Sequence, residues 1–176
     1  MKIGFCGTMS VGKTTLVNAL KKDNVFKKYK FATERSKYLN SLGIPLNTDS
    51  TYKGQMIFAA ERAAELLQEN MITDRTVIDV IAFSKLSKQM DENEKDMIED
   101  ILILLIKDYD VIFHIDDLNI PIENNGIRET DADYRKEIAK EIEGIIEEYG
   151  TLCNKIIKVS GTTKERVNQV KASLSL

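Results

Sequence analysis

A six-residue turn near the start of the chain constrains the fold more than any other feature. It reads GTMSVG, from Gly7 to Gly12, and separates a strand-like run at residues 2–6 from a run with apolar residues at helical spacing at 13–22. The two glycines let the backbone curl tightly. In such a curl successive N–H groups point inward at one anion, and the start of the following helix adds a favourable dipole. The turn therefore predicts a strand, an anion-binding loop and a helix in succession.

The turn and the two residues after it match the P-loop, or Walker A, pattern GxxxxGK followed by Ser or Thr. In that pattern Lys13 is expected to reach the β- and γ-phosphates of a nucleoside triphosphate, and the Thr14 hydroxyl is expected to ligate Mg²⁺. The predicted cofactors are therefore ATP and Mg²⁺. The predicted nucleotide contacts in this segment are Gly7, Ser10, Val11, Gly12, Lys13, Thr14 and Thr15.

Strand-like and helix-like segments alternate along the rest of the chain. The strand-like runs lie at residues 2–6, 30–34, 71–75, 110–116 and 154–161, and the longer helix-like runs at 13–22, 52–70, 77–89, 91–107 and 130–150. The helix at 130–150 is expected to begin with a capping box formed by Thr130 and Asp133. This alternation predicts an α/β fold, a parallel five-stranded sheet between two helical layers. No linker or repeat interrupts it, so we expect one domain over residues 1–176.

Composition narrows the class of partner. The chain has 25 basic and 28 acidic side chains and a net charge of −3, so a large nucleic-acid footprint is not favoured, although a local basic patch is compatible with it. The longest apolar run, ILILLI at residues 101–106, is too short to cross a membrane. A strand starts close to Met1 without a leader pattern, and we expect a cytoplasmic protein whose Cys6 and Cys153 are free thiols.

Other P-loop classes fit the sequence less well. A GTPase is expected to carry a DxxG segment and an NKxD or TKxD segment; the chain has no DxxG, and its NKII and TKER segments lack the final Asp. Larger ring-forming ATPases add a helical lid domain, for which 176 residues leave no length. A small kinase and a compact ATPase switch remain.

Two further segments resemble known kinases. Residues 55–85 resemble the thymidylate kinase signature, in which an FAADRA or FAAERA helix precedes a strand ending in DR and a helix with an Ala-aromatic pair. Residues 124–135, NNGIRETDADYR, are similar to the arginine-bearing lid of nicotinamide riboside kinase-like ATP enzymes. These resemblances imply a nucleoside or nucleotide kinase with strand order 2-3-1-4-5 and a lid at about 117–135. The segment ERS at residues 34–36 stands where thymidylate kinases have EPG, which leaves the acceptor open.

Candidate acceptor contacts follow three of the expected elements. Gln55 and Arg62 lie seven residues apart on one helix face, where an amide beside a guanidinium suits a planar base edge. Glu34, at the carboxyl end of a strand, is placed to accept the acceptor's hydroxyl proton or to hold Mg²⁺ through water. Arg35 follows it directly, and Arg75 offers a planar fork for an acceptor phosphate.

Metal and lid residues complete the expected site. Asp74 resembles a Walker B carboxylate and is favoured for Mg²⁺ over Asp116, which follows the next strand. Two arginines in and after the long loop suit the charge that develops during phosphoryl transfer, and Thr162, after the last strand, is expected near adenine. The predicted catalytic residues are Lys13, Glu34, Asp74, Arg128 and Arg135.

The function that best fits these features is transfer of the γ-phosphoryl group of ATP to a nucleotide-like acceptor. A nucleoside monophosphate, with or without the 2′-hydroxyl, is favoured because the site is expected to hold more arginines than a neutral nucleoside needs. The alternatives are a nucleoside or nicotinamide riboside kinase, a kinase acting on nucleic acid, and a regulatory ATP-binding switch without an acceptor. A homodimer is compatible with the amphipathic helices.

Overall fold

The computed structural model describes residues 1–33, 35–122 and 131–176. Its sheet contains β1 (Lys2–Cys6), β2 (Lys30–Ala32), β3 (Met71–Asp74), β4 (Val111–Ile115) and β5 (Ile156–Val159), in the order β2-β3-β1-β4-β5. Every pairing is parallel. The predicted α/β class and the strand order are therefore confirmed.

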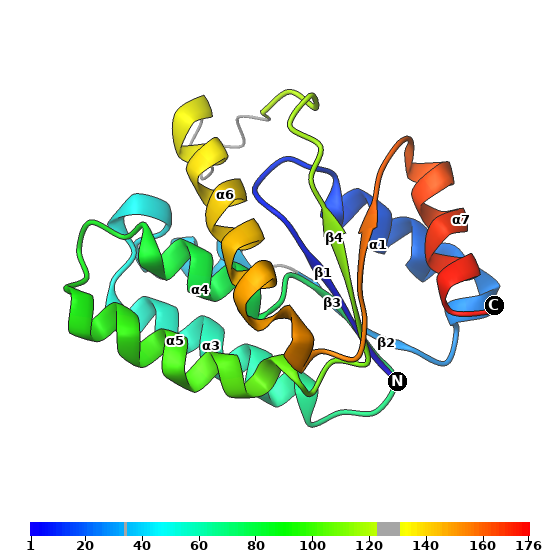
Figure 1. Cartoon of the computed structure of the whole chain (residues 1–176), viewed down its shortest axis with the longest axis horizontal. Helices are drawn as coiled ribbons and strands as arrows, with labels where there is room; N and C mark the ends of the chain where they lie inside the picture. Colours follow the sequence, from blue (N-terminus) through cyan, green and yellow to red (C-terminus); the bar gives the residue numbers. More distant parts are fainter. Residues whose placement is uncertain (34, 123–130) are drawn as a thin grey trace.

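Helices cover both faces of the sheet, as Figure 1 shows. One face carries α3 (Tyr52–Leu66), α4 (Val77–Lys85), α5 (Glu92–Ile106) and α6 (Ala132–Tyr149), and the other carries α1 (Lys13–Lys22) and α7 (Thr163–Ser173). The shorter elements are α2 (Ser36–Ser41), η1 (Asn24–Phe26), η2 (Asn47–Asp49) and η3 (Gly150–Leu152). The result is a three-layer α/β/α arrangement.

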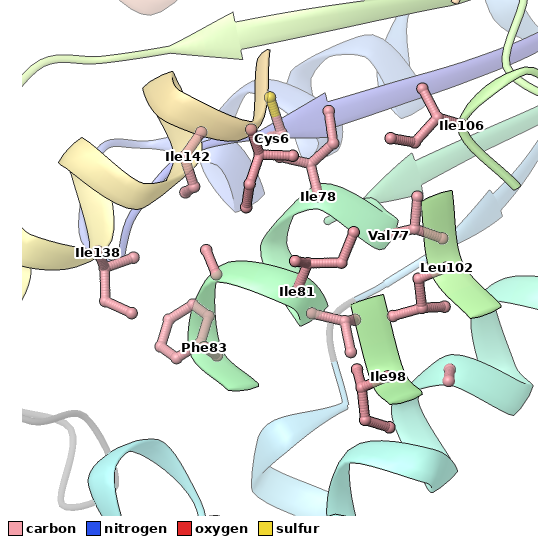
Figure 2. Close-up of a cluster of buried hydrophobic side chains, with 14 of the residues drawn as sticks. Cys6, Val77, Ile78, Ile81, Phe83, Ile98, Leu102, Ile106, Ile138 and Ile142 are labelled. Atoms are coloured by element: carbon pink, nitrogen blue, oxygen red, sulfur yellow. The ribbon is translucent and has the colours of Figure 1, made fainter. Parts of the chain in front are cut away.

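The larger of two apolar cores lies between the sheet and the α3–α6 layer (Figure 2). Its centre is α4, in which every residue except Lys85 is buried. A helix that is apolar on all sides must be enclosed, and α4 packs against α3, α5 and α6 as well as the sheet. The second core, on the other face, joins α1 and α7 to the sheet. Cys6 and Cys153 are buried free thiols.

Two helices end earlier than their apolar pattern predicts. α3 stops at Leu66 rather than at residue 70, and α4 stops at Lys85 rather than at residue 89. After α4, the Ser87 hydroxyl donates to the carbonyl of Ser50 and the Lys88 N–H donates to the carbonyl of Thr48. The chain after α4 therefore bonds to the segment before α3 instead of continuing the helix.

The expected capping box of α6 is wrong in its position. α6 begins at Ala132, and Asp131 is its N-cap, accepting from the N–H groups of Asp133 and Tyr134. Thr130 lies outside the described residues. An Asp in this position satisfies the same orphan N–H groups that a Thr–Asp box would have served.

The carboxyl ends of the strands meet at one edge of the sheet. In register, Phe5 of β1 pairs with Asp74 of β3, and Cys6 of β1 pairs with His114 of β4. The P-loop, which follows β1, therefore lies between the ends of β3 and β4. Among the described residues, no helix is long and apolar enough to cross a membrane.

Candidate active site

A cavity of about 870 Å³ opens at the carboxyl edge of the sheet. It is bounded by the P-loop and the start of α1, the end of β3, the segment after β4, and the turn between β5 and α7. The residues that line it include Ser10, Val11, Gly12, Lys13, Thr14, Thr15, Asp74, Arg75, Asp117, Thr162 and Arg166. Most of the predicted nucleotide contacts are thus brought to one cavity.

The P-loop backbone requires its two glycines. Gly7 has φ +145° and Gly12 has φ +90°, and Ser10 between them has φ 57°. A Cβ on Gly7 would collide with the carbonyl oxygen of Ile115 at the end of β4. The loop is therefore packed directly against the neighbouring strand, and only glycine fits at its first position.

Lys13 is buried and lies inside the loop's own curl. Its ammonium donates to the carbonyl oxygens of Gly7 and Thr8, at 2.5 and 2.6 Å. Burial, followed by repulsion from Arg75, lowers the pKa of Lys13 to about 8, against opposing attraction from Asp79 and Asp74. The loop therefore holds a desolvated cation beside the cavity, as phosphate binding requires.

The two residues predicted to bind Mg²⁺, Thr14 and Asp74, are hydrogen-bonded to each other. The Thr14 hydroxyl donates to Oδ2 of Asp74 at 2.6 Å, and Asp74 is fully buried at the end of β3. A hydroxyl and one carboxylate suit Mg²⁺, which keeps several waters and substrate oxygens as its other ligands. Asp116 instead accepts from Lys158 at 2.9 Å and does not line the cavity. The geometry favours Asp74 over Asp116.

Two buried arginines tie the segment after β4 to the outer side of the P-loop. Arg135 donates to the carbonyls of Ile120 at 2.7 Å and Asp117 at 3.2 Å, and makes a longer bond of 3.4 Å to Ser10. Arg166 donates to the Val11 carbonyl at 2.7 Å and pairs with the Asp117 carboxylate at 2.8 Å. Arg135 was expected to face the migrating phosphoryl group, and that role stays a prediction; Arg128 lies outside the described residues.

Thr162 lines the cavity and is also the N-cap of α7. Its hydroxyl accepts from the Glu165 N–H at 3.3 Å and donates to the Glu165 carboxylate at 2.8 Å, which closes a capping box. The cap fixes the turn between β5 and α7 at the rim of the cavity. The expected adenine contact of Thr162 remains a prediction.

A smaller cavity of about 50 Å³ adjoins the first. It is lined by Ser36, Leu46, Asn47, Gln55, Phe58, Arg75, Asp79, Val80 and Phe83, and it shares Ser36, Leu46, Asn47 and Arg75 with the larger cavity. Gln55 is 3% exposed and reaches this cavity from α3. The predicted acceptor residues Gln55 and Arg75 therefore lie together, next to the P-loop cavity.

The other predicted acceptor arginines lie away from both cavities. Arg62 is buried, donates to the carbonyls of Asp74 and Arg75, and pairs with Glu65 at 2.6 Å. Burial raises the pKa of Glu65 to about 7, although Arg62 opposes the rise. Arg35 is partly exposed and pairs with Glu61 at 2.8 Å. Glu34 lies outside the described residues.

The family comparison agrees with this geometry. A family model described as AAA domain matches residues 2–166, which include the P-loop and both cavities. The chain belongs to the AAA domain family. No curated protein sequence matches this AAA domain. The resemblance to thymidylate kinase is not confirmed by these findings.

Solved structures similar to this AAA domain share its fold at low identity. Deoxyadenosine kinase from M. mycoides, with dCMP and dCDP bound, has a TM-score of 0.74 at 17% identity, covering 99% of each chain. The Bacillus subtilis YorR protein, in complex with phosphorylated GDP, has a TM-score of 0.61 at 16% identity, covering 100% of this chain and 96% of that one. NadR, in complex with NR, has a TM-score of 0.71 at 19% identity; 99% of this chain is covered but only 52% of NadR.

Sequence reasoning missed two buried charges of this AAA domain. Asp79 accepts from the Gly7 N–H at 3.2 Å and lines the smaller cavity, and Arg166 binds the P-loop carbonyl of Val11. The pattern T-x-x-D at Thr76 to Asp79 signalled a capping box, which the structure contains. For Arg166 no comparable local pattern exists, because its partners lie 49 and 155 residues away.

Proposed function

We propose that the protein is an ATP-dependent kinase that transfers the γ-phosphoryl group to a nucleoside-type acceptor in the smaller cavity. The observation that carries this proposal is the direct junction of the P-loop cavity with a second cavity that contains an amide, Gln55, and two aromatic rings, Phe58 and Phe83. A P-loop alone would suit any nucleotide hydrolase. The adjoining cavity, at about 50 Å³, is too small to enclose a whole nucleoside, but its amide and rings suit one edge of an acceptor base whose remainder extends into the larger cavity. The likeness in fold to deoxyadenosine kinase and to NadR supports it.

The residues of the larger cavity would bind and orient the donor. The P-loop amides and Lys13 would hold the phosphates, and Thr14 with Asp74 would hold Mg²⁺, which neutralises charge on the phosphate oxygens when bound. Thr162 is proposed beside the adenine. We propose that Arg135 and Arg128 stabilise the migrating phosphoryl group and that Glu34 receives the acceptor's proton. Arg128 and Glu34 lie outside the described residues.

The charges around the smaller cavity favour a nucleoside over a monophosphate. Arg75 is the one cationic side chain among the described residues that line the smaller cavity. The Arg75 guanidinium lies 3.6 Å from the Asp79 carboxylate. The arginines on which the monophosphate expectation depended are paired elsewhere, Arg62 with Glu65 and Arg35 with Glu61. A nucleoside monophosphate is the second candidate, because Arg75 lines both cavities and so lies where an acceptor phosphate would be.

The decisive experiment is an acceptor screen. Purified protein with ATP and Mg²⁺ is mixed with nucleosides, nucleoside monophosphates, nicotinamide riboside and oligonucleotides, and acceptor-dependent ADP is measured. We expect a nucleoside to stimulate ADP formation most. Slow hydrolysis that is indifferent to every acceptor would contradict the kinase assignment and favour the ATP-binding switch.

Gln55 provides the sharpest test of the acceptor cavity. Gln55→Leu removes a buried hydrogen-bonding amide while keeping the side-chain volume, and we expect the KM for the best acceptor to rise by about tenfold or more while the KM for ATP is unchanged. Steady-state kinetics with each substrate varied in turn measure both constants. Gln68→Leu, the same change at an exposed position, is the control. An unchanged acceptor KM in Gln55→Leu would place the acceptor elsewhere.

A further inference from the structure

We propose that Asp79 is a positioning residue that couples the P-loop to the acceptor cavity. Its carboxylate is 1% exposed, and each of its oxygens bonds a different segment. Oδ1 accepts from the Gly7 N–H at 3.2 Å, and Oδ2 accepts from the N–H and hydroxyl of Thr76 at 2.8 and 3.0 Å. The coupling to the acceptor depends on the proposed function, whereas the effect on the P-loop does not.

The comparison with two other helices of the chain shows that capping alone does not explain Asp79. Glu94 of α5 and Glu165 of α7 occupy the same third position of a capping box. Each uses Oε2 to bond the residue that caps its own helix. Asp79 does this with Oδ2 and extends Oδ1 to Gly7, on another element 72 residues away. Oδ1 of Asp79 therefore binds the P-loop and does not contribute to the capping of α4.

On the nucleotide side, Asp79 and Lys13 bind the two peptide groups that flank the Gly7 Cα. The Gly7 N–H donates to Asp79, and the Gly7 carbonyl accepts from the Lys13 ammonium at 2.5 Å. Gly7 has φ +145°, and the orientations of the peptide groups on either side of it are held by these two contacts and by close packing on β4. A buried anion at this amide fixes the first residue of the loop, from which the following N–H groups take their direction.

On the acceptor side, Asp79 faces the guanidinium of Arg75. The two groups lie 3.6 Å apart, and the Arg75 guanidinium also lies over the Phe83 ring, 4.9 Å from its centre. Arg75 has φ +91°, and its N–H donates to the carbonyl of Phe5, which lies two residues before the P-loop glycine Gly7. An acceptor that contacts Arg75 thus changes the charge environment of the carboxylate that holds Gly7.

The test uses Asp79→Asn, which keeps the shape of the side chain. Its amide oxygen can still accept from Thr76, but the other position becomes an NH₂ group that faces the Gly7 N–H, two donors in opposition. We expect the affinity for a non-hydrolysable ATP analogue with Mg²⁺, measured by calorimetry, to fall about tenfold. In the wild type, an acceptor identified by turnover should change the analogue's affinity at least fivefold, and this change should disappear in the variant.

Two variants separate positioning from helix capping. Glu94→Gln weakens the same type of box on α5, whose residues do not line either cavity. Thr76→Val removes the hydroxyl bond to Asp79 and leaves the Gly7 contact in place. Both should lower the unfolding midpoint without changing analogue affinity. If the affinity of Asp79→Asn equals that of Glu94→Gln, the inference is overturned.

A measurement on the wild type covers the case in which Asp79→Asn does not fold. The amide resonance of Gly7 should shift when the acceptor alone is added, because Asp79 and Arg75 connect the two. An unmoved Gly7 resonance, with other residues of the smaller cavity shifting, would contradict the coupling. Absence of acceptor turnover in the wild type would count against the proposed function instead, and the analogue affinity of Asp79→Asn would still test the P-loop half.

Discussion

Lys13 is a buried cation at the centre of the site. Its ammonium is enclosed by the P-loop, donates to two backbone carbonyls, and lies near enough to Arg75 to be repelled by it. Burial and that repulsion lower its pKa from 10.5 to about 8. Charging this group therefore destabilises the folded state, and a polyphosphate would reverse the sign of that effect.

Replacing Lys13 should separate stability from binding. In the wild type the folded state holds this proton more weakly than the unfolded state, so its cost, about 3 kcal/mol, is fully present below pH 8 and is relieved as pH rises toward 10.5. We expect Lys13→Met to be more stable than wild type at pH 7 and to lose about 2 kcal/mol of that advantage by pH 10. Urea unfolding of both proteins at each pH measures it.

The same variant should bind ATP far more weakly, since it lacks the cation that faces the phosphates. A Lys13→Met protein less stable than wild type at pH 7, or a difference independent of pH, would contradict the assigned pKa. Lys21→Met, an exposed lysine on the same helix, is the matched control and should show neither effect.

Sequence patterns located residues at the cavity where the pattern is local, and the roles expected of these residues stay predictions. Gly7, Gly12, Lys13 and Thr14 follow from the P-loop spacing, and Asp74 follows from a strand that ends in a carboxylate. Sequence patterns did not locate the charged side chains whose partners are distant in sequence. Arg62 shares the buried face of α3 with Gln55, as helical spacing indicates, but pairs with Glu65 rather than lining the acceptor cavity. Spacing gives the face of a helix, not the partner that a long side chain reaches.

At the scale of elements, α7 is attached to the P-loop and to the segment after β4 through one buried arginine. Arg166, in the first turn of α7, joins the Val11 carbonyl to the Asp117 carboxylate after β4, and its side chain is 3% exposed. A second pair, Lys171 with Asp23, links α7 to the end of α1 nearer the solvent. The first contact therefore fixes the turn that carries Thr162 relative to the nucleotide loop.

Breaking this attachment should loosen one wall of the cavity. Arg166→Met leaves the Val11 carbonyl and the Asp117 carboxylate without their buried cation, and we expect a loss of about 3 kcal/mol in unfolding free energy. Hydrogen exchange should quicken in residues 8–12. Lys171→Met, on the same helix with a partly exposed partner, should cost less than about 1 kcal/mol. Equal losses in the two variants would show that Arg166 has no special role.

Element boundaries were less predictable than element types. The apolar stripes of α3 and α4 continue beyond the last turn of each helix, and α4 stops where Ser87 and Lys88 bond the backbone before α3. The residue at which the helix ends is thus determined by tertiary contacts, and the spacing of apolar residues gives no information about them. The start of α6 differs from the expected one because the side chain of Asp131 is its N-cap and accepts from the first N–H groups of the helix.

At the scale of the whole molecule, nucleotide binding should stabilise the folded chain. The large cavity is lined by the P-loop, the end of β3 and the starts of α1 and α7, so a ligand in it contacts several elements that are distant in sequence. At a concentration one hundred times its Kd, a ligand adds about 2.7 kcal/mol. For a chain of this size that corresponds to a rise in Tm of about 5–10 °C.

Differential scanning fluorimetry with ADP, ATP analogue and Mg²⁺ measures the shift. Lys13→Met should show almost none, which serves as the control for non-specific effects of the nucleotide. A wild-type Tm that does not move with any purine nucleotide would contradict the assignment of the cavity.

The strand order brings a consequence for synthesis. β1 is the central strand, yet its partners β3 and β4 begin at Met71 and Val111, so neither edge of it can be paired early in translation. Pairings this far apart in sequence are slow to form. The nascent chain must therefore carry an exposed segment, KIGFC, until β3 and β4 have been synthesised, and the ability to retain a nucleotide should arise only after β4 has left the ribosomal tunnel.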